Sequence, residues 1–247
     1  MQKVITIPDI GMVSITKKSN ATRIKLRVHP NKGILVTIPH NLKFKIGEEF
    51  VYKNLEWLKD KLKNIREKKQ QDIFTPESIF ITRKSSVKFI PFDSENLKAK
   101  FDGQNISFYY NPSLIDFSDK GIQDFITKFI VRSLKIEASD YLINRAYHLS
   151  DRTKIKFNKI SIGTASTRWG SCSSCNDIIL SCRLILLPDE LINYVILHEL
   201  CHVLYKNHGI MFHSLLDKLV NGRSKELNNL LKKHSTEPVP GDYRFLK

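Results

Sequence analysis

Two histidines and a glutamate lie at the spacing of a helical metal site in the stretch VILHELCHVLYKNHGIMFH, residues 195–213. His198 and His202 are four residues apart, so in a helix both imidazoles project from one face and can converge on an ion. Glu199 follows the first histidine and is rotated from it by about 100°, so its carboxylate can reach a water molecule beside the ion without being a ligand. Zinc hydrolases use this His-Glu-x-x-His pattern to combine two nitrogen ligands with a general base.

The residues around this pattern are almost all apolar, which is typical of a buried helix. Ionisable groups in such a helix need partners inside the protein, and a metal ion satisfies the two imidazoles. The alternative is that the histidines are hydrogen-bonded core residues and that the glutamate belongs to an ion pair. We favour the metal site, because burying three ionisable groups together without an ion is costly. The apolar residues are Val195, Ile196, Leu197, Leu200, Cys201, Val203 and Leu204.

A catalytic zinc ion takes a third protein ligand and keeps its fourth position for water. His208 is the first candidate, because it follows the expected helix end, where Gly209 favours a turn that returns the imidazole toward the ion. His213 and Glu226 are the alternatives, since a third ligand can also come from a later helix. The residues alone leave all three open, with His208 preferred.

The cysteines offer a competing metal or redox site. Cys172 and Cys175 form a Cys-x2-Cys pair, and Cys182 and Cys201 follow it along the chain. We expect reduced thiols instead, because Cys201 lies inside the His-Glu-x-x-His segment and disulfides are rare in a reducing compartment.

The hydrophobic pattern predicts the elements that position these residues. A long apolar stripe begins at Gly121 and indicates a helix, and two runs rich in isoleucine and leucine indicate strands. Pro188 followed by two acidic residues favours a helix start ahead of His198. The expected order is a helix over 121–149, strands over 154–163 and 177–187, the histidine helix ending at 207–209, helices over 211–219 and 224–234, and an extended tail over 238–247.

The first part of the chain reads mostly as strands. Two alternating segments, 23–28 and 33–38, flank the turn-forming residues HPNKG and predict a hairpin. Apolar residues at helical spacing predict one amphipathic helix over 46–71. Further strand-like runs occupy 78–92 and 97–110, and the second is split by the turn sequence DGQN.

Composition limits the location and the partners of the chain. A net charge of +15 favours polyanions, but the lysines are dispersed through amphipathic segments, so we expect at most a weak, salt-sensitive association with nucleic acid. No run approaches the roughly 18 to 20 apolar residues of a membrane-spanning helix. The first residues lack the order of an export signal. We expect a cytoplasmic protein without membrane contact.

The segments TRWGSCS (167–173), RLILLP (183–188) and HELCHVLYKNHGIMF (198–212) together resemble the YgjP-like metallopeptidase family. Members of that family are predicted metal-dependent hydrolases, related to SprT-like proteins and to the wider zincin group. The family also has an N-terminal region similar to RIKLRVHPNKGILVTIP, followed by an amphipathic helix that contains a tryptophan such as Trp57. The resemblance therefore spans most of the chain.

The resemblance implies a zinc ion bound by His198, His202 and His208, with Glu199 as the catalytic acid/base. His213 stands where the family commonly has tryptophan, and we interpret it as a packing residue. The resemblance also implies that the bond hydrolysed is a peptide bond.

We therefore predict an α+β chain with two regions. A β-rich accessory region with one amphipathic helix occupies residues 1–115, and a zincin-like metallohydrolase region, whose active-site helix packs on a small β-sheet, occupies 116–247. The predicted function is a zinc-dependent metallopeptidase that acts on peptide or protein substrates. An extended peptide is expected to pair with the edge of the strand over 177–187, and Arg168 and Tyr205 are the candidates for stabilising the oxyanion.

The alternative function is a basic nucleic-acid-associated protein with a structural or vestigial zinc site. Glu199 argues against it, because a purely structural site needs no general base.

Overall fold

The structure is a computed structural model that describes residues 1–29, 33–71, 73–236 and 238–243. Its contacts divide the chain into two compact units, Met1–Asp72 and Ile73–Lys247. Each unit has a hydrophobic core of its own. None of the helices in the described ranges combines the length and the apolar character needed to cross a lipid bilayer.

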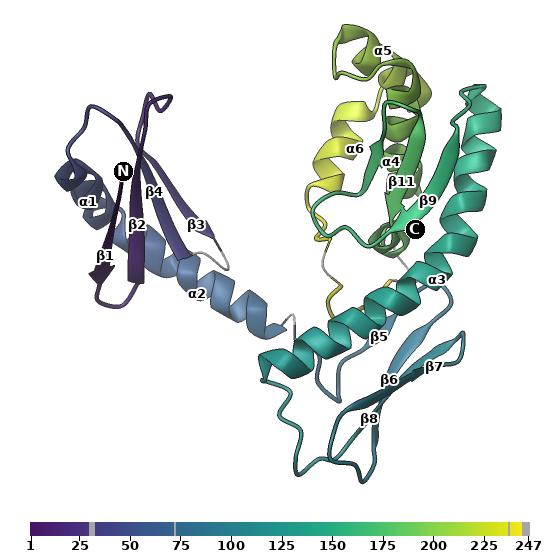
Figure 1. Ribbon diagram of the computed structural model, residues 1–247, viewed down its shortest axis with the longest axis horizontal. Helices are drawn as coiled ribbons and strands as arrows, with labels where there is room; N and C mark the ends of the chain where they lie inside the picture. The colour runs from purple at the N-terminus through teal and green to yellow at the C-terminus, as the bar shows by residue number, and fades with distance from the viewer. Residues whose placement is uncertain (30–32, 72, 237, 244–247) are drawn as a thin grey trace. The chain divides into compact units, whose positions relative to one another are not determined.

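The first unit is a four-stranded sheet packed against two helices (Figure 1). Its elements are β1 (Gln2–Ile7), β2 (Gly11–Lys18), β3 (Lys25–His29), β4 (Gly33–Pro39), α1 (Phe44–Lys53) and α2 (Leu55–Gln71). The strand order is β1-β2-β4-β3, in which β2 and β4 are parallel and the two outer pairs are antiparallel. Alternate strand residues such as Val13, Ile15 and Val36 are buried in one core with Val51 and Leu58 of the helices.

The predicted hairpin is confirmed, because β3 pairs antiparallel with β4; residues 30–32 of its turn lie outside the described residues. The prediction of one helix over 46–71 is wrong. Asn54 leaves the helical conformation between α1 and α2, and its side-chain amide donates to the carbonyl of Phe50 at 2.7 Å. An asparagine that bonds to a nearby backbone carbonyl competes with helix continuation, which accounts for the break. Strands β1 and β2 were not predicted.

The second unit contains two sheets joined by one long helix. The five-stranded sheet has the order β12-β5-β6-β8-β7, and the three-stranded sheet has the order β10-β11-β9. Its elements are β5 (Phe80–Ile81), β6 (Ser86–Pro91), β7 (Lys98–Phe101), β8 (Asn105–Tyr110), α3 (Lys120–Thr153), β9 (Lys159–Gly163), β10 (Gly170–Cys172), β11 (Asp177–Ser181), the 3-10 helix η1 (Cys182–Leu186), α4 (Asp189–Leu204), α5 (Ile210–Leu219), α6 (Ser224–Leu231) and β12 (Gly241–Asp242).

Helix α3 contacts both sheets and η1, and its buried side chains belong to the core of the second unit (Figure 1). Phe80, Ile106 and Phe108 from the strands belong to the same core. The strands between residues 73 and 115 therefore pack in the second unit, and the predicted region 1–115 extends over both units. The α+β fold class is as predicted from the sequence.

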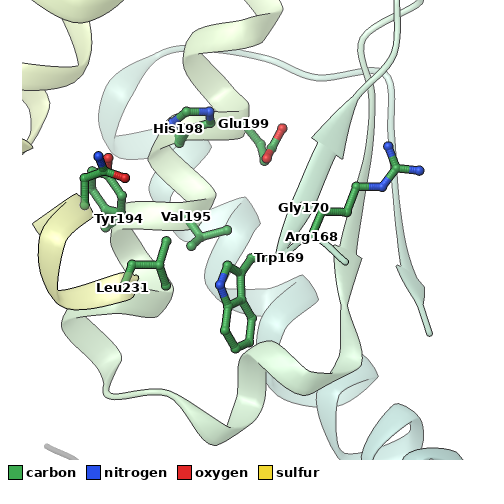
Figure 2. A pocket seen from close by; sticks show the side chains of 9 residues that line it. Arg168, Trp169, Gly170, Tyr194, Val195, His198, Glu199 and Leu231 are labelled. Carbon is green, nitrogen blue, oxygen red and sulfur yellow. The ribbon is translucent and has the colours of Figure 1, made fainter. Parts of the chain in front are cut away.

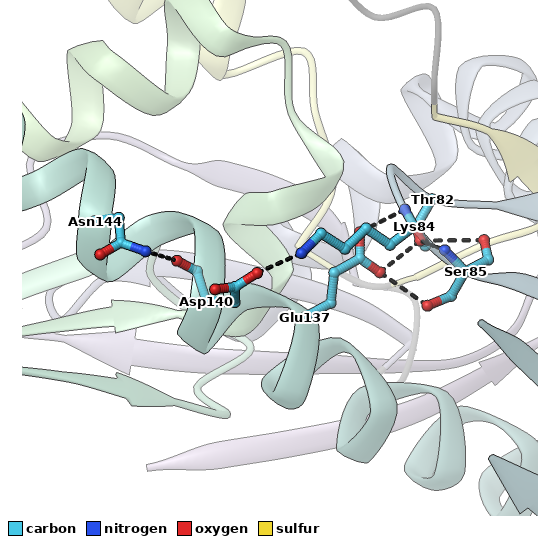
Figure 3. A network of polar contacts seen from close by, with 6 residues as sticks. All are labelled: Thr82, Lys84, Ser85, Glu137, Asp140 and Asn144. Atoms are coloured by element: carbon cyan, nitrogen blue, oxygen red, sulfur yellow. Dashed lines mark hydrogen bonds and ion pairs between the residues drawn. The ribbon is translucent and has the colours of Figure 1, made fainter. Parts of the chain in front are cut away.

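A buried carboxylate fixes the loop between β5 and β6 to α3 (Figure 3). Glu137 is 5% exposed, and its side chain accepts hydrogen bonds from the hydroxyls of Thr82 (2.6 Å) and Ser85 (3.1 Å). It also accepts from the backbone N–H of Lys84 at 3.0 Å. Three donors compensate for the loss of hydration of this carboxylate, so the loop is held in one place.

The same loop contacts the start of α4. Arg83 donates to the carbonyl of Leu187 at 3.1 Å and forms an ion pair with Asp189 at 2.5 Å. Tyr141 of α3 donates to the same aspartate at 2.6 Å. The first turn of α4 is thereby tied to both α3 and the β5–β6 loop.

The prediction of a strand over 177–187 is only partly correct. The strand ends at Ser181, and residues 182–186 form η1. All five residues of η1 are buried, whereas a half-buried strand buries alternate residues. The Ser181 hydroxyl accepts from the backbone N–H of Arg183 and caps this turn. The long helix is confirmed over Lys120–Thr153, while the extended tail is seen only at 241–242, and 244–247 lie outside the described residues.

Candidate metal centre

Helix α4 carries the His-Glu-x-x-His residues and ends earlier than predicted. It begins after Pro188 with two acidic residues in the first turn, as the sequence indicates. Its last residue is Leu204, because Tyr205 is extended (φ −130°, ψ 100°) while its N–H still bonds to the carbonyl of Cys201 at 2.9 Å. The segment after residue 204 is therefore free to turn back toward the helix face.

Three imidazoles converge where that segment returns. The Nε2 atom of His208 lies 3.1 Å from the Nε2 atom of His198 and 3.1 Å from that of His202. The side chain of Phe212, in α5, is fully buried, and its ring centroid lies 4.6–4.9 Å from those of all three imidazoles. This ring supports the cluster from one side and limits how the imidazoles can rotate.

Hydrogen bonding and burial favour the neutral, metal-binding form of two of these imidazoles, His198 and His202. The Nδ1 atom of His202 is 3.0 Å from the carbonyl of Tyr205, so Nδ1 carries the proton and donates it, and the Nε2 lone pair is left for an ion. Burial lowers the pKa of His198 to about 4 and also lowers the pKa of His202. Both imidazoles are therefore neutral at physiological pH.

The donor set fits a zinc ion. Zinc–nitrogen bonds of about 2.0–2.1 Å in tetrahedral geometry place two ligand nitrogens about 3.3 Å apart, close to the observed 3.1 Å. A cation between these nitrogens would be coordinated by their lone pairs. Within the described part of the chain, this is the one group of three or more His, Cys, Asp or Glu side chains close enough to hold an ion.

Glu199 lies beside the three histidines, and its carboxylate is buried. It is 5% exposed, and its Oε2 atom has no hydrogen-bond partner among the described residues. Burial raises the pKa of Glu199 to about 7, against a smaller opposing effect of the positive charge on Arg168. A carboxylate with this pKa can both accept and release a proton near neutrality.

Gly170, the first residue of β10, makes room for that carboxylate. A Cβ atom at this position would lie 2.7 Å from Oε1 and 2.8 Å from Cγ of Glu199, closer than nonbonded atoms approach. A side chain at position 170 would therefore require the Glu199 side chain to move. This role of Gly170 was not predicted from the sequence. The glycine within TRWGSCS could have indicated it, since glycine in a strand often marks a close backbone approach.

The other candidate residues lie apart from the three imidazoles. His213 is exposed, and its ring centroid is 6.2 Å from that of His208. The carboxylate of Glu226 accepts from the guanidinium of Arg223 at 2.6 and 2.8 Å. All four cysteines are free, and Cys182 and Cys201 are buried in the core.

The chain is similar to one protein family and to two of the solved structures. The model of the family described as "YgjP-like, metallopeptidase domain" matches residues 22–234 of this chain. Among solved structures, the chain is similar to the metallopeptidase zymogens abylysin of Pyrococcus abyssi and jannalysin of Methanocaldococcus jannaschii, with 20% and 23% identity and a TM-score of 0.34 in both cases. Each similarity covers 37% of this chain, and 93% and 94% of the respective zymogen. No curated protein matches the chain.

Proposed function

We propose that this chain, which belongs to the YgjP-like metallopeptidase family, is a zinc-dependent peptidase in which Glu199 is the general acid/base. Family membership supports a metal-dependent hydrolase, and the proposal adds the metal and the base. One observation carries it: the Nε2 atoms of His198, His202 and His208 converge next to a buried carboxylate that does not belong to the cluster. We propose that the three imidazoles hold the zinc ion.

Each group of the chain has a distinct task in this reaction. When bound, zinc supplies a Lewis acid that polarises the scissile carbonyl and lowers the pKa of a water molecule. Glu199 takes a proton from the attacking water and returns it to the nitrogen of the leaving amine. In the chain without a bound ion, burial raises the pKa of Glu199 to about 7, which favours proton uptake by this carboxylate.

The predicted substrate edge is corrected by the sheet order. Strand β11 lies between β10 and β9, so residues 177–181 have no free edge for a peptide. Strand β10 is at the edge of this sheet, and its first residue is the glycine beside Glu199. We propose that an extended substrate pairs with β10, which would bring its backbone next to the general base. The nucleic-acid alternative has only the net charge of +15 in its favour.

Removal and return of the metal tests the proposal. We expect the purified protein to contain one zinc ion per chain, to hydrolyse peptides, to lose that activity in a chelator, and to recover it with zinc. The measurements are elemental analysis and hydrolysis of a quenched fluorescent peptide library. Peptide hydrolysis that persists in the metal-free protein would refute the zinc-dependent mechanism.

The close approach at Gly170 leads to a second expected result. Gly170→Ala should displace the Glu199 carboxylate and lower kcat by about 100-fold, since a displacement of around 1 Å in a reacting group has an effect of that order. Zinc content should stay at the wild-type level, because the atoms nearest to the added methyl group belong to Glu199 and not to an imidazole. Ser171→Ala on the same strand is the matched control and should retain activity. Equal kcat values for Gly170→Ala and wild type would contradict the positioning role.

A further inference from the structure

A cavity opens next to His198 and Glu199, and its walls come from three elements (Figure 2). The segment that enters β10 contributes Trp169, α4 contributes Tyr194 and Val195, and α6 contributes Asn228 and Leu231. Its volume is about 240 Å³. Pockets for drug-sized ligands typically enclose roughly 300–1,000 Å³. The cavity is thus suited to one large side chain rather than to a whole small molecule.

The walls of this cavity are mainly apolar. Tyr194 and Val195 are 5% and 4% exposed, and Trp169 and Leu231 are partly buried against the same core. Figure 2 shows Arg168 with its guanidinium directed away from the other labelled side chains. Besides Glu199 and His198 at one end, the lining residues with polar groups are Asn228, Arg168 and Tyr194.

We propose that this cavity binds a large apolar side chain, of the leucine, methionine or phenylalanine type, from the substrate residue next to the scissile bond. The inference rests on the proposed peptidase function and assigns its substrate class. The cavity shares His198 and Glu199 with the site of bond cleavage, so a side chain that fills it belongs to a residue flanking that bond. Burial of apolar surface against the indole and the aliphatic wall provides the binding energy.

Charged substrate side chains are disfavoured by the same walls. A carboxylate would lie next to the Glu199 carboxylate and lose its hydration among mainly apolar walls. A lysine or arginine side chain would also lose its hydration among these walls, and an ion pair with Glu199 would compete with the attacking water for the carboxylate. The cavity therefore discriminates among substrate side chains by their polarity as well as by their size.

Cleavage of a peptide library tests the assignment in the zinc-loaded full chain. The library is randomised on both sides of the scissile bond, and products are identified by mass spectrometry. We expect strong enrichment of leucine, methionine and phenylalanine at one flanking position. Cleavage without apolar enrichment at either position would overturn the subsite and leave the peptidase function standing. Absence of any cleavage would overturn both.

Two neighbouring asparagines on α6 provide a matched pair of variants. Asn228 lines the cavity, whereas Asn229 is exposed and does not. Asn228→Trp should fill the cavity and lower kcat/KM for the preferred apolar peptide by at least about tenfold, with little change for the same peptide carrying alanine at that position. Asn229→Trp should change neither value. An equal loss on both peptides in Asn228→Trp would contradict selective filling.

Binding without turnover gives an independent readout. The chain has two tryptophans, so Trp57→Phe leaves Trp169 in the cavity wall as the sole indole reporter. In zinc-loaded Trp57→Phe/Glu199→Gln protein, the preferred peptide should change the Trp169 emission and saturate, while its aspartate analogue should not. Equal responses to the two peptides would overturn the proposal. Asn228→Lys offers a further check, since a cation in the wall should shift the library profile toward acidic residues.

Discussion

Glu199→Gln is expected to keep its zinc and to lower kcat for peptide hydrolysis by about 10²- to 10⁴-fold, the usual contribution of a general acid/base. Glutamine has nearly the same size, so the buried position beside Gly170 is still filled. It cannot accept and return a proton at neutral pH. The substitution therefore removes the proton transfer and leaves the three imidazoles in place. Parallel assays of zinc content and peptide hydrolysis measure the two effects separately.

The matched control for this result is Glu226→Gln. Glu226 is an acidic residue in the same unit, but its carboxylate pairs with Arg223 and is more than half exposed. This variant should keep both the zinc and the activity. If Glu199→Gln hydrolysed peptides at the wild-type rate, the catalytic assignment would be lost. If it also lost zinc, Glu199 would be part of the metal site rather than a base beside it.

The local part of the site could be predicted because helix geometry alone determines it. The i, i+4 spacing places His198 and His202 on one face, whatever the helix packs against. The position of His208 is less local, since it depends on where α4 ends. The helix stops at Leu204 and not near Gly209, and no residue pattern indicates that earlier end. The apolar residues of α4 from Val195 to Cys201 are buried, as their composition predicts, whereas Leu204 at the end of the helix is 56% exposed.

Features that depend on tertiary packing could not be predicted from the hydrophobic pattern. The break at Asn54 does not interrupt the apolar pattern, because Val51 and Leu58, on either side of it, are both buried in the same core. A short apolar run such as 182–186 reads equally as a buried strand or a buried helical turn, so periodicity could not separate the two. The role of Gly170 depends on the approach of β10 to α4, which joins segments distant in the sequence.

The second large effect is expected on zinc affinity when His208 is replaced by alanine. His208→Ala should lower the zinc affinity by more than the roughly 10- to 100-fold that follows the loss of an outer-sphere partner, and hydrolysis should fall with the zinc content. The reason is direct: the Nε2 atom of His208 is the one that lies 3.1 Å from both other Nε2 atoms. Competition with a fluorescent zinc chelator measures the affinity, and unfolding by heat in the metal-free state checks that the variant is folded.

His213→Ala is the matched control, since it removes the same side chain five residues along the chain. Its ring centroid lies 6.2 Å from that of His208, and its side chain does not belong to the converging group. Zinc affinity should therefore stay near the wild-type value. The reverse pattern, with zinc lost from His213→Ala and kept by His208→Ala, would transfer the third ligand to α5. Because His208 follows the end of α4 while His213 lies within α5, that pattern would also require the segment between them to close differently around the ion.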